Sequence, residues 1–300
     1  MAKTSSRITF LGFGEAAQAF AKGLRREGGP HVMRAFDIKT DGPQARAKRG
    51  DYAECDVIGE ATSADACRDA CLIFSLVTAE QAEAAAAEAA RANLGGALFL
   101  DCNSCAPGTK RRAAAMISAA SGRYVDVAIM TPVHPRLHRS HCLLAGAEAQ
   151  AALEATRALG METEIAGVDV GAASVRKMVR SVMIKGLEAL TLECFLAGRK
   201  AGIDADVLAS LEATFPGFDW QRRVPYMLER ALTHGTRRAT EMQEVVQALR
   251  ELGIAPHMAE ATCARQREAG SLGLDAGDLG AHDISAITDA ILTGLASEET

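Results

Sequence analysis

A glycine-rich turn near the start of the chain has the residue types and spacing that bind a pair of phosphates. The segment Gly12–Ala17 (GFGEAA) follows the apolar run Arg7–Leu11 and precedes an alanine-rich stretch. In a G-x-G-x-x-A turn the first glycine makes the tight bend, and the second lets backbone N–H groups approach a pyrophosphate. The pattern therefore predicts a dinucleotide-binding turn. The residues expected to contact the dinucleotide are Gly12, Phe13, Gly14, Glu15 and Ala16.

An acidic residue ends the next apolar run, Val32–Asp37. Asp37 stands 25 residues after Gly12, where a carboxylate accepts hydrogen bonds from the adenosine ribose and repels a 2′-phosphate. This placement favours NAD over NADP. Lys39 is close enough to offset part of the repulsion, so NADP stays open. A helix cap or a loop aspartate is the alternative interpretation of Asp37.

Lys177 has the chemistry of a general acid or base. It lies in the proline-free stretch Gly171–Ala201, between the cationic neighbours Arg176 and Arg180. When a hydride leaves a carbinol carbon, a base must take the hydroxyl proton, and lysine can do so if desolvation or nearby positive charge lowers its pKa toward neutrality. A solvent-facing lysine on a basic stretch of helix is the alternative.

The elements that would position these residues differ between the two halves of the sequence. Short apolar runs alternate with helical stretches as far as Glu162–Ile165, which predicts βαβ units and a mostly parallel sheet. Only helices are expected afterwards. Their predicted ranges are Gly171–Ala201, Asp206–Ala213, Trp220–Thr233, Arg237–Leu252 (capped by Thr236), Pro256–Ala269 and His282–Leu295. We therefore expect an α/β fold in which a Rossmann-type dinucleotide-binding domain, residues 1–167, precedes an all-α domain for substrate binding and dimerisation, residues 168–300.

With these features in view, the sequence resembles the β-hydroxyacid dehydrogenases, which include 3-hydroxyisobutyrate dehydrogenase and 6-phosphogluconate dehydrogenase. The likeness rests on the Gly12–Ala17 turn, on Lys177 in a G-x-x-x-x-x-K context, and on Asp101–Pro107 (DCNSCAP), which is similar to the family motif D-x-[SN]-[ST]-x-x-P. It extends over almost the whole chain in layout. It is most evident for a poorly characterised subgroup with a distinctive C-terminal domain.

The resemblance implies further site residues. Lys177 would be the catalytic acid/base, with Ser181 where the family has an asparagine. Additional cofactor contacts would come from Leu76, Val77, Thr78 and Asn103. Substrate contacts would come from Ser104, Met130, Thr131, Pro132, Arg180 and Arg238, with a surface arginine at a helix start as the alternative for Arg238. Of these, Met130–Pro132 replace the family's carboxylate-binding Ser-Gly-Gly, and Arg180 is expected to take over that carboxylate. Lys185, eight residues after Lys177 and on nearly the same helix face, is a further candidate for substrate, with a place in the domain interface as its alternative.

The resemblance also implies the activity: NAD(P)-dependent hydride transfer to or from the alcohol carbon of a small, anionic hydroxy acid, carried out by a homodimer. Two alternatives stay open. One is an imine reductase, although such enzymes usually lack the catalytic lysine. The other is a non-catalytic dinucleotide sensor, in which the replacement at Ser181 reflects lost chemistry.

Composition and charge exclude other classes. The formal net charge of −5 argues against nucleic acid. No apolar run approaches the roughly 20 residues that span a bilayer, and no secretory leader is evident, so we expect a cytoplasmic protein with neither a membrane nor a nucleic-acid partner. Cys102 and Cys105 form a C-x-x-C that we interpret as unpaired thiols, because no second pair completes a zinc site. His134–His141 carries three histidines, which we assign to a solvated or substrate-facing loop. No metal is expected.

Overall fold

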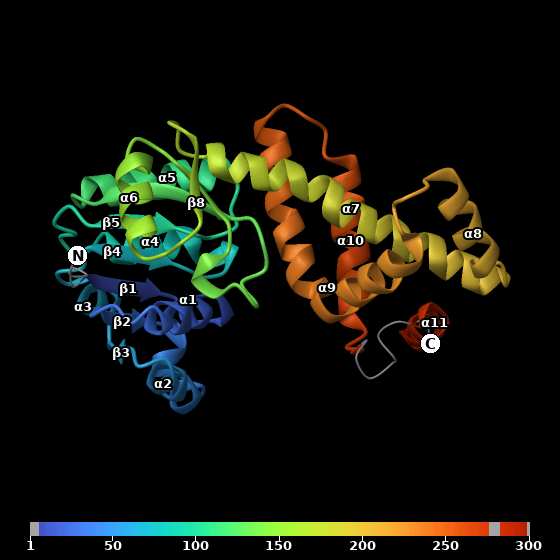
Figure 1. Ribbon diagram of the computed structural model, residues 1–300, viewed down its shortest axis with the longest axis horizontal. Coiled ribbons are helices and arrows are strands. Elements are labelled where there is room, and N and C mark those ends of the chain that lie inside the picture. The colour runs from blue at the N-terminus through green and yellow to red at the C-terminus, as the bar shows by residue number, and fades with distance from the viewer. Residues whose placement is uncertain (1–5, 276–282, 299–300) are drawn as a thin grey trace. The chain divides into compact units, whose positions relative to one another are not determined.

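The computed structural model describes residues 6–275 and 283–298, and its chain divides into two compact units (Figure 1). The first unit is Met1–Lys177 and the second is Met178–Thr300. The division falls inside one helix, ten residues beyond the expected boundary after residue 167. The first residues of that helix group with the sheet because its N-terminus is held there, as described below.

The first unit is built on one sheet, as the alternation of apolar runs predicts. Its strands are β1 (Arg7–Leu11), β2 (Val32–Phe36), β3 (Ile58–Gly59), β4 (Leu72–Ser75), β5 (Leu98–Asp101), β6 (Arg123–Ile129), β7 (Cys142–Ala145) and β8 (Thr163–Gly167). Their order is β3-β2-β1-β4-β5-β6-β7-β8, and every neighbouring pair is parallel except β6 and β7. The strand order reverses between β1 and β4, so the carboxyl ends of these two strands border a crevice suited to a ligand.

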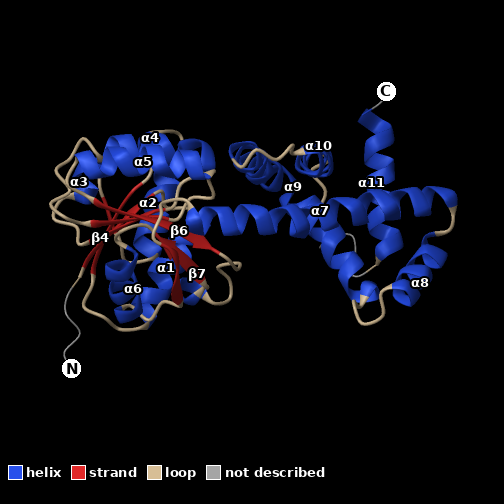
Figure 2. Ribbon diagram, turned by 90° about the horizontal axis from the view of Figure 1, so that it is seen from above, coloured by secondary structure: helices blue, strands red, loops and turns tan. Residues whose placement is uncertain are grey.

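Helices cover both faces of the sheet (Figure 2). On one face lie α3 (Ser63–Cys67), α4 (Ala82–Ala89) and α5 (Pro107–Ala119), and on the other lie α1 (Glu15–Arg26) and α6 (Ala149–Ala158). α2 (Ala45–Glu54) follows β2. Alternate strand residues point to opposite faces.

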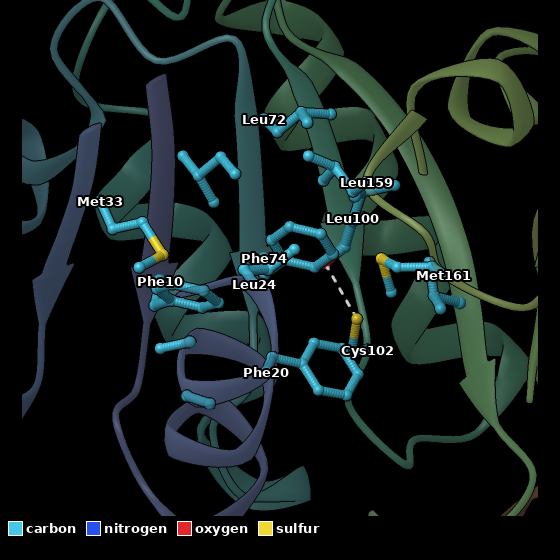
Figure 3. Packing of buried hydrophobic residues seen from close by; sticks show 14 of the residues in the cluster. Phe10, Phe20, Leu24, Met33, Leu72, Phe74, Leu100, Cys102, Leu159 and Met161 are labelled. Carbon is cyan, nitrogen blue, oxygen red and sulfur yellow. Dashed lines mark hydrogen bonds between the residues drawn. The ribbon is translucent and has the colours of Figure 1, made fainter. Parts of the chain in front are cut away.

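The core on the α1 side of the sheet is rich in aromatic side chains (Figure 3). Phe10 of β1 stacks on Phe74 of β4 with ring centroids 5.7 Å apart, and Phe20 of α1 meets Phe74 edge-on at 5.9 Å. Leu100 and Cys102 extend the same layer. This packing fixes α1, and with it the turn that precedes the helix, against the middle of the sheet.

The second unit is helical. It contains most of α7 (Ala172–Ala201), with α8 (Asp204–Thr214), α9 (Trp220–Glu251), α10 (His257–Ser271) and α11 (Ile284–Glu298). Its core includes Leu192, Phe195, Trp220, Leu228 and Ile291. The predicted α/β fold with a helical C-terminal half is therefore confirmed, while the expected start of the last helix at His282 lies outside the described residues.

One helical prediction is wrong. The sequence suggested two helices, Trp220–Thr233 and Arg237–Leu252, with Thr236 as a cap, but residues 220–251 form the single helix α9 and Thr236 lies in its interior. Gly235 is the reason. A Cβ there would lie 2.7 Å from the backbone nitrogen of Gly270, so the glycine serves a close crossing with α10 and does not end a helix. Tertiary packing thus overrides the low helix propensity of glycine.

Within the described residues, none of the helices combines the length and the apolar character that crossing a bilayer requires.

Candidate active site

The Gly12 turn has the geometry of a phosphate cradle. Gly12 has φ +78°, and a Cβ on it would lie 2.7 Å from both the carbonyl oxygen of Leu76 and Cγ1 of Val77. Gly14 is exposed, and a Cβ there would meet no heavy atom within 4 Å. Gly14 is also the N-cap of α1, and because it has no side chain it cannot cap the free N–H groups of the helix. The first N–H groups of α1 therefore face open space, where a helix N-terminus attracts an anion.

The backbone of Phe13 fastens this turn from both sides. Its N–H donates to Oδ2 of Asp37 at 2.7 Å, and its carbonyl oxygen accepts from Nζ of Lys48 at 2.7 Å. The other oxygen of Asp37 accepts from the N–H of Lys39 at 2.9 Å. Asp37 therefore caps the short 3-10 helix Ile38–Asp41 and also ties the end of β2 to the turn. Lys48 could not be predicted as a site residue, since in the charged run ARAKRG its sequence context is that of a surface lysine.

A pocket of about 320 Å³ opens beside the turn, at the carboxyl ends of β1, β2 and β4. It is lined by Leu11, Gly12, Gly14, Phe36, Asp37, Ile38, Lys39, Ser63, Leu76, Val77, Thr78, Gln81, Ala84, Ala85 and Glu88. Six of the residues predicted to bind cofactor line it: Gly12, Gly14, Asp37, Leu76, Val77 and Thr78. Its walls are mainly apolar, with the carboxylate of Asp37 and the side chain of Lys39 at one side. An aromatic base with an attached ribose matches this combination. Among the lining residues, Ile38, Ser63 and Gln81 had no distinguishing sequence signal.

Asn103 is buried and ties two loops together. Its Oδ1 accepts from the N–H of Val77 at 2.8 Å, while its Nδ2 donates to Oγ of Ser75 at 2.9 Å and to Oδ1 of Asp101 at 2.7 Å. The side chain thus joins the loop after β4 to the loop after β5. Ser104 follows it and is half-buried. Direct contact of either residue with a ligand stays a prediction.

Asp126 of β6 holds the N-terminus of α7. Its Oδ2 accepts from the N–H groups of Gly171 at 3.0 Å and Ser174 at 3.1 Å, and its Oδ1 accepts from Oγ of Ser174 at 2.6 Å. A carboxylate in this position satisfies free N–H groups and complements the positive end of the helix dipole. Lys177 lies one helical turn beyond Ser174, so its backbone position follows from this anchor.

The half-buried Lys177 lies near two thiols at the same edge of the sheet. Burial raises the pKa of the Cys142 thiol to about 12, and the ammonium of Lys177 opposes that rise. Burial likewise raises the pKa of Cys102, again with Lys177 acting in the opposite direction. Because Cys102 directly precedes Asn103, Lys177 and the Asn103 loop lie at one end of the sheet. The thiols themselves are buried and unpaired.

The loop after β6 carries the residues that replace the family's carboxylate motif. The N–H of Met130 donates to the carbonyl oxygen of His141 at 2.9 Å, and the carbonyl oxygen of Pro132 accepts from Oγ of Ser140 at 3.2 Å. Between them, Oγ1 of Thr131 is buried and has no hydrogen-bond partner among the residues that the structure describes. An unsatisfied buried hydroxyl costs free energy unless a ligand or water pairs with it.

The remaining predicted residues belong to the second unit. Ser181 is half-buried and Arg180 is exposed on α7. Lys185 pairs with Glu241 at 2.8 Å, and Arg238 pairs with the buried Glu188. Burial raises the pKa of Glu188, while Arg238 opposes the rise. Lys185 and Arg238 therefore each have a carboxylate partner within their own unit, and their assignment to substrate stays a prediction. Across the described parts of the chain, no group of three His, Cys, Asp or Glu side chains is arranged to hold a metal ion.

Two regions of the chain match known families. Residues 7–104 match the family described as NADP oxidoreductase coenzyme F420-dependent, and residues 199–269 match a domain of unknown function, DUF1932. Among solved structures, a conserved hypothetical protein from Sinorhizobium meliloti 1021 is 36% identical, with 95% of this chain and 96% of that chain covered and a TM-score of 0.74. Another conserved protein, whose structure is described as similar to 3-hydroxyacid dehydrogenases, is 28% identical over 96% of this chain and 99% of that chain, with a TM-score of 0.69.

The chain belongs to the β-hydroxyacid dehydrogenase family. Like the subgroup it resembles, this β-hydroxyacid dehydrogenase homologue has a distinctive C-terminal domain, here the one that matches DUF1932. At lower identity the fold alone is shared. A 3-hydroxyisobutyrate dehydrogenase from Mycobacterium tuberculosis is 17% identical, with a TM-score of 0.71 over 96% of this chain and 99% of that chain. A reductive aminase from Aspergillus terreus, solved with NADPH4, is 21% identical, with a TM-score of 0.56 over 95% and 99%.

A curated relative has no assigned activity. It is an uncharacterized 28.5 kDa protein of Methanothermus fervidus, 27% identical over 165 residues, which are 55% of this chain. The match spans 63% of the length of that relative. Solved structures that share the fold of this chain include 3-hydroxyisobutyrate dehydrogenases, a reductive aminase and an imine reductase.

Proposed function

We propose that this protein is an NAD(P)-dependent oxidoreductase that interconverts a small, anionic hydroxy acid and the corresponding carbonyl compound. The observation that carries the proposal is that the first unit contains both a dinucleotide-type pocket and a candidate acid/base. The Gly12 turn and its pocket lie at the carboxyl ends of β1 and β4, and Lys177 lies by the loop that follows β5. The first feature fits a dinucleotide and the second supplies an acid/base.

The residues of the turn and pocket fit a nicotinamide dinucleotide. The pyrophosphate would be held by the N–H groups at the start of α1, which Gly14 leaves uncovered. The adenosine would occupy the pocket, with its ribose at Asp37. When bound, the dinucleotide supplies the hydride acceptor or donor. Because Asp37 faces the ribose position, we expect NAD to be preferred.

The chain's own contribution to the chemistry is proton transfer and orientation. Lys177 would take the hydroxyl proton from the substrate during oxidation and return it during reduction. Thr131 would contribute its unpaired hydroxyl to the substrate, and Arg180 would bind its carboxylate. Asp126 would keep Lys177 in reach by holding the start of α7. Ser181 would assist as a short hydrogen-bonding group one turn further along the helix.

The first test is a fluorescence titration with NADH and NADPH. We expect saturable binding of NADH that is tighter than that of NADPH. Failure of both to bind at concentrations up to about 1 mM, well above ordinary cofactor affinities, would refute the proposal at its first step. Tighter binding of NADPH would show that Lys39, and not Asp37, dominates recognition of the ribose.

The second test is turnover. Wild type would be screened with NAD against small 2- and 3-hydroxy acids, and Lys177→Met would be compared on each active substrate. General acid–base catalysis contributes about 10²- to 10⁴-fold, so we expect a loss of that order in kcat with cofactor affinity preserved. Lys200→Met is the matched control, because Lys200 is an exposed lysine on the last turn of the same helix. A Lys177→Met enzyme as active as this control would refute the role of Lys177.

The likeness in fold to the reductive aminase and to an imine reductase, both from Aspergillus terreus, supports a second candidate function. It predicts reduction of cyclic imines by NADPH with no turnover of any hydroxy acid. A protein that binds NADH but turns over neither class would instead act as a dinucleotide sensor. We further propose that this protein is a cytoplasmic homodimer.

A further inference from the structure

We propose that Lys110 is a positioning residue that joins the cofactor loop to the helix carrying Lys177, an inference that rests on the function proposed above. Lys110 belongs to the first turn of α5 and its side chain is completely buried. It is one cation between two carboxylates: Nζ lies 3.0 Å from Oδ1 of Asp101 and 3.5 Å from Oδ1 of Asp126. It also donates to the carbonyl oxygen of Asp101 at 2.7 Å.

The two carboxylates belong to neighbouring strands in direct register, since Asp101 of β5 pairs with Asp126 of β6. Asp101 is 1% exposed and Asp126 is fully buried. Two buried carboxylates on neighbouring strands repel each other unless a cation lies between them. Burial alone would lower the pKa of Lys110, but Asp101 and Asp126 together raise it, so the lysine is charged. Tyr124 completes the group by donating to Oδ2 of Asp101 at 2.6 Å.

One arm of this network reaches the cofactor loop. Oδ1 of Asp101 accepts from the N–H and the Nδ2 of Asn103, at 3.0 and 2.7 Å. Asn103 in turn accepts from the N–H of Val77, a residue of the pocket wall. Lys110 is therefore two side chains away from the loop that borders the dinucleotide pocket.

The other arm reaches the catalytic helix. Asp126 accepts both N–H bonds and the hydroxyl bond that fix Gly171 and Ser174 at the start of α7. Gly171 also touches α5 directly, since a Cβ on it would lie 2.9 Å from Cβ of Pro107. The buried ammonium of Lys110 thus sets the spacing between two parts of the proposed site. One is the Val77 loop, which borders the dinucleotide pocket, and the other is α7, which carries Lys177. Hydride transfer is sensitive to such spacing, because a misplacement of about 1 Å can lower a rate by about 100-fold.

The test compares Lys110→Met with the charge-matched double variant Lys110→Met/Asp101→Asn. Wild type has one cation and two anions in the cluster, a sum of −1, and the double variant has one anion, also −1. The double variant removes the buried repulsion without restoring the bridge. If Lys110 only balances charge, the double variant recovers both the melting temperature and the activity. If Lys110 positions the two arms, the double variant recovers the melting temperature and not the activity.

Three readouts separate the outcomes. We expect AMP affinity, by calorimetry, to stay within about threefold of wild type in both variants, because Asp37, the proposed ribose ligand, is bonded to Phe13 and Lys39 and not to the Lys110 cluster. We expect the rate of hydride transfer in a single turnover to fall by about 100-fold in both, with little change in KM. An unchanged rate in Lys110→Met, or a rate restored in the double variant, would overturn the proposal.

The third readout does not depend on a substrate. Hydrogen exchange should accelerate together at the amides of Val77, Gly171 and Ser174 in Lys110→Met, since both arms lose their common anchor. Faster exchange on one arm alone, or on neither, would overturn the link, and this result requires no substrate. If wild type binds no nicotinamide cofactor, the proposed function is refuted. The exchange experiment still tests whether Lys110 links the Val77 loop to the start of α7.

Discussion

Gly235 offers the sharpest test of how the helical unit packs. Replacing glycine by alanine inside a helix gains about 1 kcal/mol of helix propensity. At Gly235, however, the added Cβ would meet backbone atoms of α10: it would overlap the carbonyl oxygen of Gln266 and lie 2.7 Å from the nitrogen and 2.8 Å from Cα of Gly270. Backbone atoms cannot rotate away, so the cost falls at the upper end of the about 1–3 kcal/mol typical of overpacking. Gly235→Ala should therefore lower the unfolding free energy by about 2 kcal/mol.

Gly186 in α7 is the matched control. A Cβ there would lie 3.7 Å from Oγ1 of Thr262, an ordinary contact. The same substitution should therefore keep the propensity gain and raise stability by about 1 kcal/mol. The two variants carry the same substitution at interior helix positions of the same unit, and the structure predicts opposite changes in the free energy of unfolding.

Trp220 makes the measurement specific. It is the one tryptophan of the sequence and is buried in the core of the helical unit, so its emission follows the unfolding of that unit. In guanidinium chloride, with a slope of about 3 kcal/mol per molar, the two variants should differ in midpoint by about 1 M, with wild type between them. A Gly235→Ala midpoint equal to or above that of Gly186→Ala would refute the backbone-to-backbone crossing, and with it the explanation of why α9 continues through residues 234–236.

Three further outcomes follow from the structure. Asp37→Asn should weaken NADH binding and reduce the preference for NADH over NADPH, because the carboxylate that would face the ribose is lost. An unchanged ratio of the two dissociation constants in the fluorescence titration would show that another residue determines cofactor selectivity. Burial lowers the pKa of His138, with Glu27 opposing the shift, so the stability due to this neutral histidine is present above the unfolded pKa of about 6.5 and is lost as pH falls through the lower folded value. In calorimetry, the melting temperature of wild type should therefore drop more steeply than that of His138→Gln as the pH is lowered through about 6.5, and parallel curves would contradict this sign. Finally, Met183 and Leu190 are exposed apolar residues of α7; if they cover a homodimer interface, Met183→Asp/Leu190→Asp should halve the mass measured by light scattering, whereas a wild type that already has the mass of one chain would exclude the dimer.

The local parts of the site could be predicted because each depends on a few adjacent residues. A strand, two glycines and a helix make the phosphate cradle at Gly12 and Gly14 by backbone geometry alone, and the alternation of apolar runs predicts a parallel sheet. The position of Asp37 at the end of β2 follows from the same spacing. These features are visible in sequence because their physical cause lies within about 25 residues of chain.

The parts that escaped prediction depend on residues far apart in sequence. Lys48 and Lys110 look like surface lysines, and only the fold buries them, one against the carbonyl oxygen of Phe13 and the other between Asp101 and Asp126. Gly235 lies in the gap between the two helices predicted from the sequence, but its packing partner is Gly270, 35 residues away, and the helix is continuous. Burial and close approach are properties of pairs, and a pair exists only after the chain has folded. The sequence therefore determined what kind of ligand the turn can hold, while the tertiary structure decided which charges and which glycines hold the site in place.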